Sequence, residues 1–185
     1  MKLISVNVGV GRDASWQGKQ VRTSIWKSAV HGRVRVFRLN VEGDRQSDLA
    51  VHGGVEMAVY AYPAEHYSYW RRELPGVDLP WGAFGENFTT EGLLEDEVKI
   101  GDRFRCGSAE FMVTKPRMPC YKLALRLDRA DVVKRFLHSR RSGFYLEVLR
   151  EGDVAAGDPI DRAGRGQDGA LTVAETVSLY VRKKA

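Results

Sequence analysis

The sequence predicts a mostly β fold with a few peripheral helices and a short helical appendage at its C-terminus. Short runs of β-branched and aromatic residues recur between turn residues, whereas helical spacing of apolar residues is confined to three segments. The chain has 185 residues, of which 43% are hydrophobic and 29% charged. A chain of this length can bury its core without a disulfide or a structural metal, so any metal is expected to serve function.

The expected strands follow one another along most of the chain. They cover residues 3–8, 34–39, 58–62, 104–105, 110–114 and 144–149. The stretch 9–20 is rich in glycine and polar residues and is expected to be a loop. Residues 101–113 predict a hairpin with its turn at 106–108, which places Cys106 close to a turn.

Residues 64–74 and 131–139 each place their apolar side chains on one face and are expected to form amphipathic helices. Near the C-terminus, Thr172 and Glu175 match a capping box that would begin a third helix. The segment 161–170 before it has the composition of a linker.

These elements divide the chain into a main domain over 1–160, a linker over 161–170 and a C-terminal helix over 171–185. A helix of roughly ten residues is marginal alone. It is expected to dock on the main domain, on a second subunit or on helices outside this sequence. A homodimer is therefore one of the expected possibilities.

The charge balance favours anionic partners only weakly. Lysine and arginine number 29 against 24 aspartates and glutamates, a formal net charge of +5, and the basic residues are scattered along the chain. Nucleic acid and a phosphate-bearing cofactor are both candidate partners. A nucleic-acid-binding module is the weakest hypothesis, because only the net charge suggests it, and steep loss of DNA binding with salt would support it.

The two cysteines, Cys106 and Cys120, exclude a scaffold of several disulfides and favour a reducing compartment. The first residues lack the unbroken apolar stretch of a signal peptide, and no apolar run approaches the roughly 18 residues of a membrane span. We therefore expect a cytoplasmic protein that has no membrane partner.

The segment 114–123 carries two prolines, three cations and Cys120 directly after an expected strand. The prolines stiffen the loop. Lys115, Arg117 and Lys122 would favour the thiolate form of Cys120, which is the form that acts as a nucleophile or soft-metal ligand. The alternative is that Cys120 is a small buried apolar residue at the start of the next element.

Two further segments carry candidate binding residues. In 48–56, His52 precedes Gly53 and Gly54, whose backbone N–H groups could converge on an anion, or which could simply form a tight turn. In 81–90, Glu86 and Asn87 could position a heterocycle or a water molecule, or could pair with an arginine and cap a turn.

Taken in order, these segments resemble the MOSC family, the domain named after the C-terminal part of molybdenum cofactor sulfurase, and within it the bacterial 6-N-hydroxylaminopurine resistance group. The matching segments are 5–9, 48–54, 60–67, 82–92, 115–123 and 142–145. The resemblance implies a MOSC-type β-barrel with peripheral helices. It also implies that Cys120 falls on the family cysteine that ligates molybdenum or carries sulfur for it.

The family resemblance implies reduction of small N-hydroxylated bases and related compounds, with molybdopterin performing the redox step and a separate protein donating electrons. In this hypothesis Cys120 is both the molybdenum ligand and the catalytic residue. The remaining candidate cofactor-binding residues are His52, Gly53, Gly54, Glu86, Asn87, Arg117, Lys122 and Arg22.

The alternative is a carrier that holds a persulfide on Cys120, or passes the cofactor on, without reductase activity of its own. Two departures from the family pattern stand out. Met57 occupies a position where the family often has a basic residue, which removes one expected phosphate contact. The group commonly ends in a three-helix domain, of which this sequence holds one recognisable helix.

Overall fold

The computed structural model describes residues 1–47 and 53–182. It is mostly β, as predicted, and it has four α-helices where the sequence predicted three. The main sheet has eight strands, and every neighbouring pair is antiparallel except the parallel pair β6 and β7. In spatial order the strands are β12 (Ile160–Gly164), β8 (Arg103–Cys106), β9 (Ala109–Pro116), β10 (Phe144–Arg150), β6 (Val59–Pro63), β7 (Phe88–Glu91), β1 (Lys2–Val8) and β4 (Ser28–Ala29).

The sheet curls but is not a closed barrel, which corrects the expected β-barrel. Within the described residues no strand pair joins the two terminal strands, β12 and β4. Instead a single bridge links Lys2 to Pro159, and the N–H of Ile160 donates to the carbonyl of Met1 at 2.9 Å. The start of β1 therefore contacts the start of β12 without forming a ladder.

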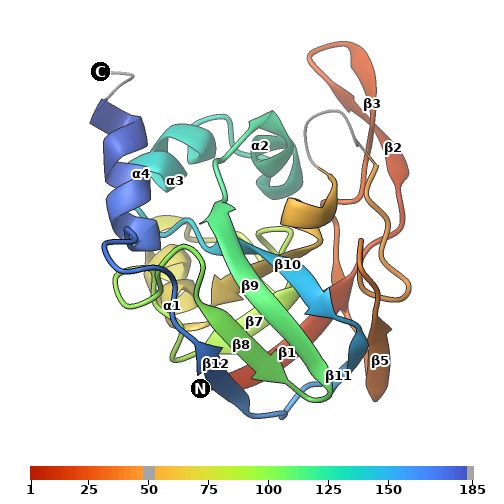
Figure 1. Cartoon of the computed structure of the whole chain (residues 1–185). Helices are drawn as coiled ribbons and strands as arrows, with labels where there is room; N and C mark the ends of the chain where they lie inside the picture. The colour runs from red at the N-terminus through yellow and green to blue at the C-terminus, as the bar shows by residue number, and fades with distance from the viewer. Residues whose placement is uncertain (48–52, 183–185) are drawn as a thin grey trace.

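Two small sheets flank the main one. β5 (Arg33–Val36) pairs with β11 (Gly152–Ala155), and β2 (Arg12–Trp16) pairs with β3 (Lys19–Thr23). The second pair is a hairpin that projects from the body on the same side as the helices (Figure 1). It occupies much of the expected loop 9–20. Its mostly polar, exposed strands lack the apolar alternation that marks a half-buried strand, so the pattern was not visible in sequence.

Three helices contribute to an aromatic cluster outside the core of the main sheet, and two of them, α2 and α3, lie at one end of the sheet (Figure 1). The helices are α1 (Glu65–Glu73), α2 (Tyr121–Leu127) and α3 (Val132–Ser139). The rings of Trp70 and Phe136 stack with centroids 5.4 Å apart, and the indole N–H of Trp70 donates to the Tyr62 hydroxyl at 2.6 Å. The first and third helices were predicted within two residues, whereas α2, only seven residues long, was not.

The C-terminal region contacts the main sheet through β12 and α4. β12 pairs with β8 inside the expected linker, and α4 (Val173–Arg182) places Val173 in the core of the main sheet. The capping box forms as predicted, because the N–H of Glu175 donates to the Thr172 hydroxyl at 3.1 Å and the Glu175 carboxylate accepts the N–H of Thr172 at 2.8 Å.

The glycine-rich stretch before α4 is held by Asp102. The buried Asp102 carboxylate accepts the N–H of Gly166 at 2.9 Å and pairs with Arg162. Composition alone made the segment 161–170 resemble a linker, because tertiary hydrogen bonds such as these leave no signal in the composition.

No helix in the described part of the chain is both long and apolar enough to span a bilayer.

Candidate functional site

A polar cavity lies where the main sheet, α2 and the loop after β3 meet. It encloses about 670 Å³ of empty space, including its open mouth. Its wall combines hydroxyls, four basic groups, one carboxylate and one thiol. The residues that line it are Thr23, Ser24, Ile25, Lys27, Asp44, Arg45, Gln46, Ser47, Met57, Ala58, Tyr60, Phe84, Gly85, Asn87, Arg117, Cys120, Lys122 and Tyr145.

Cys120 reaches the cavity because of its position between two elements. β9 ends at Pro116, which pairs with Phe144, and the chain then crosses to α2. Cys120 takes an extended backbone just before the first turn of that helix, and its carbonyl accepts the N–H of Leu123 at 3.0 Å. Its side chain is half-buried in the cavity wall.

Arg117 is a buried cation in the same wall, with 5% of its surface exposed. Its guanidinium lies over the rings of Tyr60 and Phe136, at 5.4 and 5.3 Å from the two centroids. Its Nη1 atom is buried and has no hydrogen-bond partner among residues 1–47 and 53–182. Burial lowers the pKa of Arg117, but neighbouring phenols and the Cys120 thiol raise it by more, so the group stays cationic.

Lys122 and Tyr145 complete this side of the cavity. Lys122 lies on the first turn of α2 and is 7% exposed. Burial raises the pKa of Tyr145, and the Arg117 guanidinium opposes that shift through charge and a hydrogen bond. Cys120 interacts electrostatically with Arg117 and Tyr145, and it shares the cavity with the cations Arg117 and Lys122. Lys115, the third cation of this segment, pairs instead with Glu56 at 2.7 Å and does not line the cavity.

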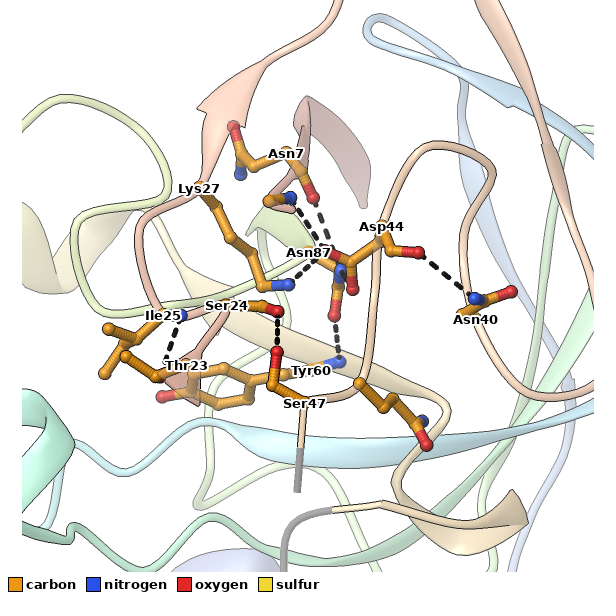
Figure 2. A network of polar contacts seen from close by, with 12 residues as sticks. Asn7, Thr23, Ser24, Ile25, Lys27, Asn40, Asp44, Ser47, Tyr60 and Asn87 are labelled. Carbon is orange, nitrogen blue, oxygen red and sulfur yellow. Dashed lines mark hydrogen bonds and ion pairs between the residues drawn. The ribbon is translucent and has the colours of Figure 1, made fainter. Parts of the chain in front are cut away.

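Asn87 also lines the cavity, and it connects three segments (Figure 2). Its side-chain oxygen accepts the N–H of Tyr60 at 3.1 Å, and its amide nitrogen donates to Asp44 at 2.9 Å and to the Asn7 carbonyl at 3.3 Å. Asp44 in turn pairs with Lys27, with 2.5 Å between the carboxylate Oδ1 and the ammonium nitrogen.

Glu86 lies beneath the cavity rather than on its surface. The carboxylate is fully buried and accepts hydrogen bonds from the Tyr67 hydroxyl, the N–H of Gly82 at 2.9 Å, the N–H of Phe84 at 3.1 Å and the Thr89 hydroxyl at 3.0 Å. Burial raises the pKa of Glu86, and these hydrogen bonds oppose the shift. This arrangement holds the turn that presents the cavity wall.

Three other predicted binding residues, Arg22, Gly53 and Gly54, do not line the cavity with Cys120. Arg22 lies on the exposed hairpin and pairs with Asp13 at 3.1 Å. The N–H of Gly54 donates to the side chain of Gln46 at 3.0 Å, and neither Gly53 nor Gly54 lines the cavity. His52 lies outside the described residues.

Sequence reasoning missed most of the cavity residues, among them Lys27, Asp44, Tyr60 and Tyr145. Lys27 and Asp44 are 17 positions apart in irregular segments, so no motif joins them. Tyr60 and Tyr145 were assigned to strands, and they face each other because β6 pairs with β10. Within the described residues no cluster of three or more histidine, cysteine or acidic side chains could hold a metal by itself.

Comparison with known proteins places this geometry in a family. The MOSC domain model matches residues 48–161. The uncharacterized protein YflK of Bacillus subtilis is 41% identical over 167 residues, which cover 90% of this chain and 75% of YflK. A protein named Reductase from Gibberella moniliformis is 36% identical over 146 residues, which cover 77% of this chain but 26% of that protein.

The structural match is equally extensive. The crystal structure of YiiM from Geobacillus stearothermophilus superposes with a TM-score of 0.81 at 35% identity and covers 99% of this chain and 85% of that one. The chain therefore belongs to the MOSC domain family, in its YiiM-like group.

Proposed function

We propose that this protein binds the molybdenum cofactor in the Cys120 cavity and reduces small N-hydroxylated compounds with electrons from a separate donor protein. One observation carries the proposal. A half-buried thiol shares a cavity with a buried arginine whose Nη1 atom is unpartnered in the described part of the chain, and with a second buried cation.

The donor set in the cavity fits this cofactor. A thiolate is a soft ligand suited to a heavy transition metal. A buried guanidinium with an open N–H fits a phosphate, because arginine and phosphate form charge-assisted hydrogen bonds. In the proposal Cys120 holds the metal, while Arg117 and Lys122 hold the phosphate of the pterin side chain.

When bound, the cofactor would supply the two-electron chemistry that no amino-acid side chain provides. The protein's own residues would orient it. The proline-flanked loop and the first turn of α2 fix the Cys120 thiol, and the aromatic rings of Tyr60 and Phe136 hold the Arg117 guanidinium in place. Glu86 would act indirectly: its hydrogen bonds fix the turn that places Gly85 in the cavity wall.

Family membership supports the proposal at a coarser level. The relative named Reductase shares the matched region, although this chain spans only about a quarter of that protein. An oxidoreductase activity is thus the activity class that the comparisons favour, and the metal, the substrate class and the electron donor are part of the proposal.

The test is cofactor loading and reduction in matched cysteine variants. Wild type and Cys106→Ala, the control that alters the other, buried cysteine, are expected to retain molybdenum and to reduce an N-hydroxylated amidine when supplied with a chemical reductant. Cys120→Ser is expected to lose both molybdenum and activity. Unchanged metal content and activity in Cys120→Ser would refute the ligand role. A labile extra sulfur on Cys120 without bound molybdenum, detected by intact-protein mass spectrometry, would instead identify the carrier.

A further inference from the structure

We propose that Lys27, held by Asp44, is the general acid that protonates the leaving oxygen when the N–O bond of the substrate breaks. This inference rests on the proposed reductase function and goes beyond it by assigning the proton donor. It also assigns the part of the cavity next to Lys27 to the N-hydroxylated substrate.

Lys27 and Asp44 form an ion pair that is withdrawn from water yet lines the cavity. Their side chains are 8% and 4% exposed, and the two charged atoms are 2.5 Å apart. A buried ion pair contributes little net stability, because the cost of desolvating two charges offsets their attraction. Because this pair lines a cavity although its burial adds little stability, it is a candidate for a catalytic role.

The position of the pair is set by a network that crosses the fold (Figure 2). The Asp44 carboxylate also accepts the N–H of Gly9 at 2.8 Å and the amide of Asn87 at 2.9 Å. Asn87 is itself anchored by the N–H of Tyr60 on β6. An ammonium carries three N–H donors. Asp44 accepts one of them in the described structure, which leaves capacity to donate to a ligand in the cavity.

Charge pairing distinguishes the basic groups of the cavity. Arg117 has a buried Nη1 atom without a partner in the described residues, and it lies with Lys122 in the segment that carries Cys120, which suits a phosphate. The positive charge of Lys27 is instead balanced by the Asp44 carboxylate, which would repel an anion placed beside it. A neutral polar group such as an N-hydroxyl therefore fits beside Lys27 better than a phosphate does.

The chemistry of the reduction requires an acid at this point. An N-hydroxylated amidine, two electrons and two protons give the amidine and water, with the electrons supplied by the donor protein. When the N–O bond breaks, the oxygen would leave as hydroxide unless it is protonated, so a proton passes from the Lys27 ammonium to that oxygen. The second proton reaches the nitrogen from solvent, and solvent restores the ammonium. Burial lowers the pKa of Lys27, against the opposing effect of Asp44, and this makes the ammonium a better proton donor than a lysine in water.

The test compares two substrates that differ only in the leaving group: an aryl N-hydroxyamidine and its O-acetyl ester. The ester releases a carboxylate, which leaves as an anion at neutral pH and needs no acid. Lys27→Met is expected to lower turnover of the hydroxyl substrate by roughly 10²- to 10⁴-fold, the usual contribution of general acid catalysis. Turnover of the ester should stay close to wild type.

Two further variants protect the test against a folding defect. Lys27→Met leaves Asp44 as an uncompensated buried charge, so the double variant Lys27→Met with Asp44→Asn removes both charges while keeping the shape of the pair. It is expected to show the same substrate-dependent loss. Lys134→Met, on the exposed face of α3, is the matched control and should leave both reactions unchanged. All three variants should contain wild-type amounts of molybdenum, because Lys27 is not assigned to the cofactor.

Equal losses on the two substrates would overturn the inference and make Lys27 a residue that only positions substrate, and so would no loss on either substrate. Lost molybdenum in the double variant would also overturn it, because Lys27 would then serve the cofactor. If molybdenum-loaded wild type reduced neither substrate, the proposed reductase function itself would fail, and the inference would fail with it.

Discussion

Replacing Glu86 by glutamine separates a structural role for this residue from the cofactor contact that the sequence suggested. In the structure Oε1 accepts hydrogen bonds from Gly82 at 2.9 Å and Thr89 at 3.0 Å, and Oε2 accepts the N–H of Phe84 at 3.1 Å. A glutamine that keeps its oxygen at the Oε1 position turns its NH2 group toward the Phe84 N–H. Two donors then face each other, and a buried N–H left unpaired costs about 1–3 kcal/mol.

Glu86→Ala removes both acceptors and should cost more. The Tyr67 hydroxyl can still donate to the Pro80 carbonyl, which is 3.3 Å away. The N–H groups of Gly82 and Phe84 lose their acceptor when the Glu86 carboxylate is removed. Two unpaired donors predict a loss of roughly 2–6 kcal/mol in the free energy of unfolding.

Urea denaturation followed by tryptophan fluorescence measures these losses. Glu97→Gln is the control, because Glu97 is an exposed glutamate of the same turn-rich region and its replacement should change the free energy of unfolding by less than about 0.5 kcal/mol. The folded Glu86→Gln protein should retain its molybdenum. A variant as stable as wild type that loses its molybdenum would refute this reasoning and restore Glu86 as a direct cofactor contact.

Three other predictions address the cysteines, the last helix and the ion pair. Burial raises the pKa of Cys106 to about 12 and the residue is 3% exposed, so iodoacetamide at neutral pH should modify Cys120 first, as peptide mass spectrometry would show, and early labelling of Cys106 would contradict the assignment. Thr172→Ala removes the hydroxyl that caps α4 and should cost about 1 kcal/mol in thermal denaturation, whereas an unchanged melting temperature would mean that the cap is not formed. Burial lowers the pKa of Lys27 in the folded protein below 10.5, so between the folded and unfolded pKa values the unfolded chain binds more protons. In that pH window the stability of wild type, relative to the double variant Lys27→Met with Asp44→Asn, should rise with pH, and it should level off above the window. A difference in the free energy of unfolding that stays flat or falls in urea titrations would oppose the burial of the pair.

The sequence by itself determined the strand-rich architecture, two of the three packed helices and the capping box at Thr172. These features rest on local signals, namely apolar periodicity and turn or cap residues, which act within a few positions along the chain. The cationic surroundings of Cys120 were also local, since Arg117 and Lys122 lie within three residues of the thiol. The resemblance to the MOSC family added the barrel, which the described strands do not close.

Only the tertiary structure decided which polar residues share the cavity with that thiol. Glu86 and Asn87 are adjacent in sequence, yet one is buried beneath the wall and the other lines it. Lys27 and Asp44 carry no sequence signal, and only the fold brings their two irregular segments into contact. Charge pairing and the burial of polar groups depend on contacts between segments far apart in the chain, and no local pattern encodes those contacts.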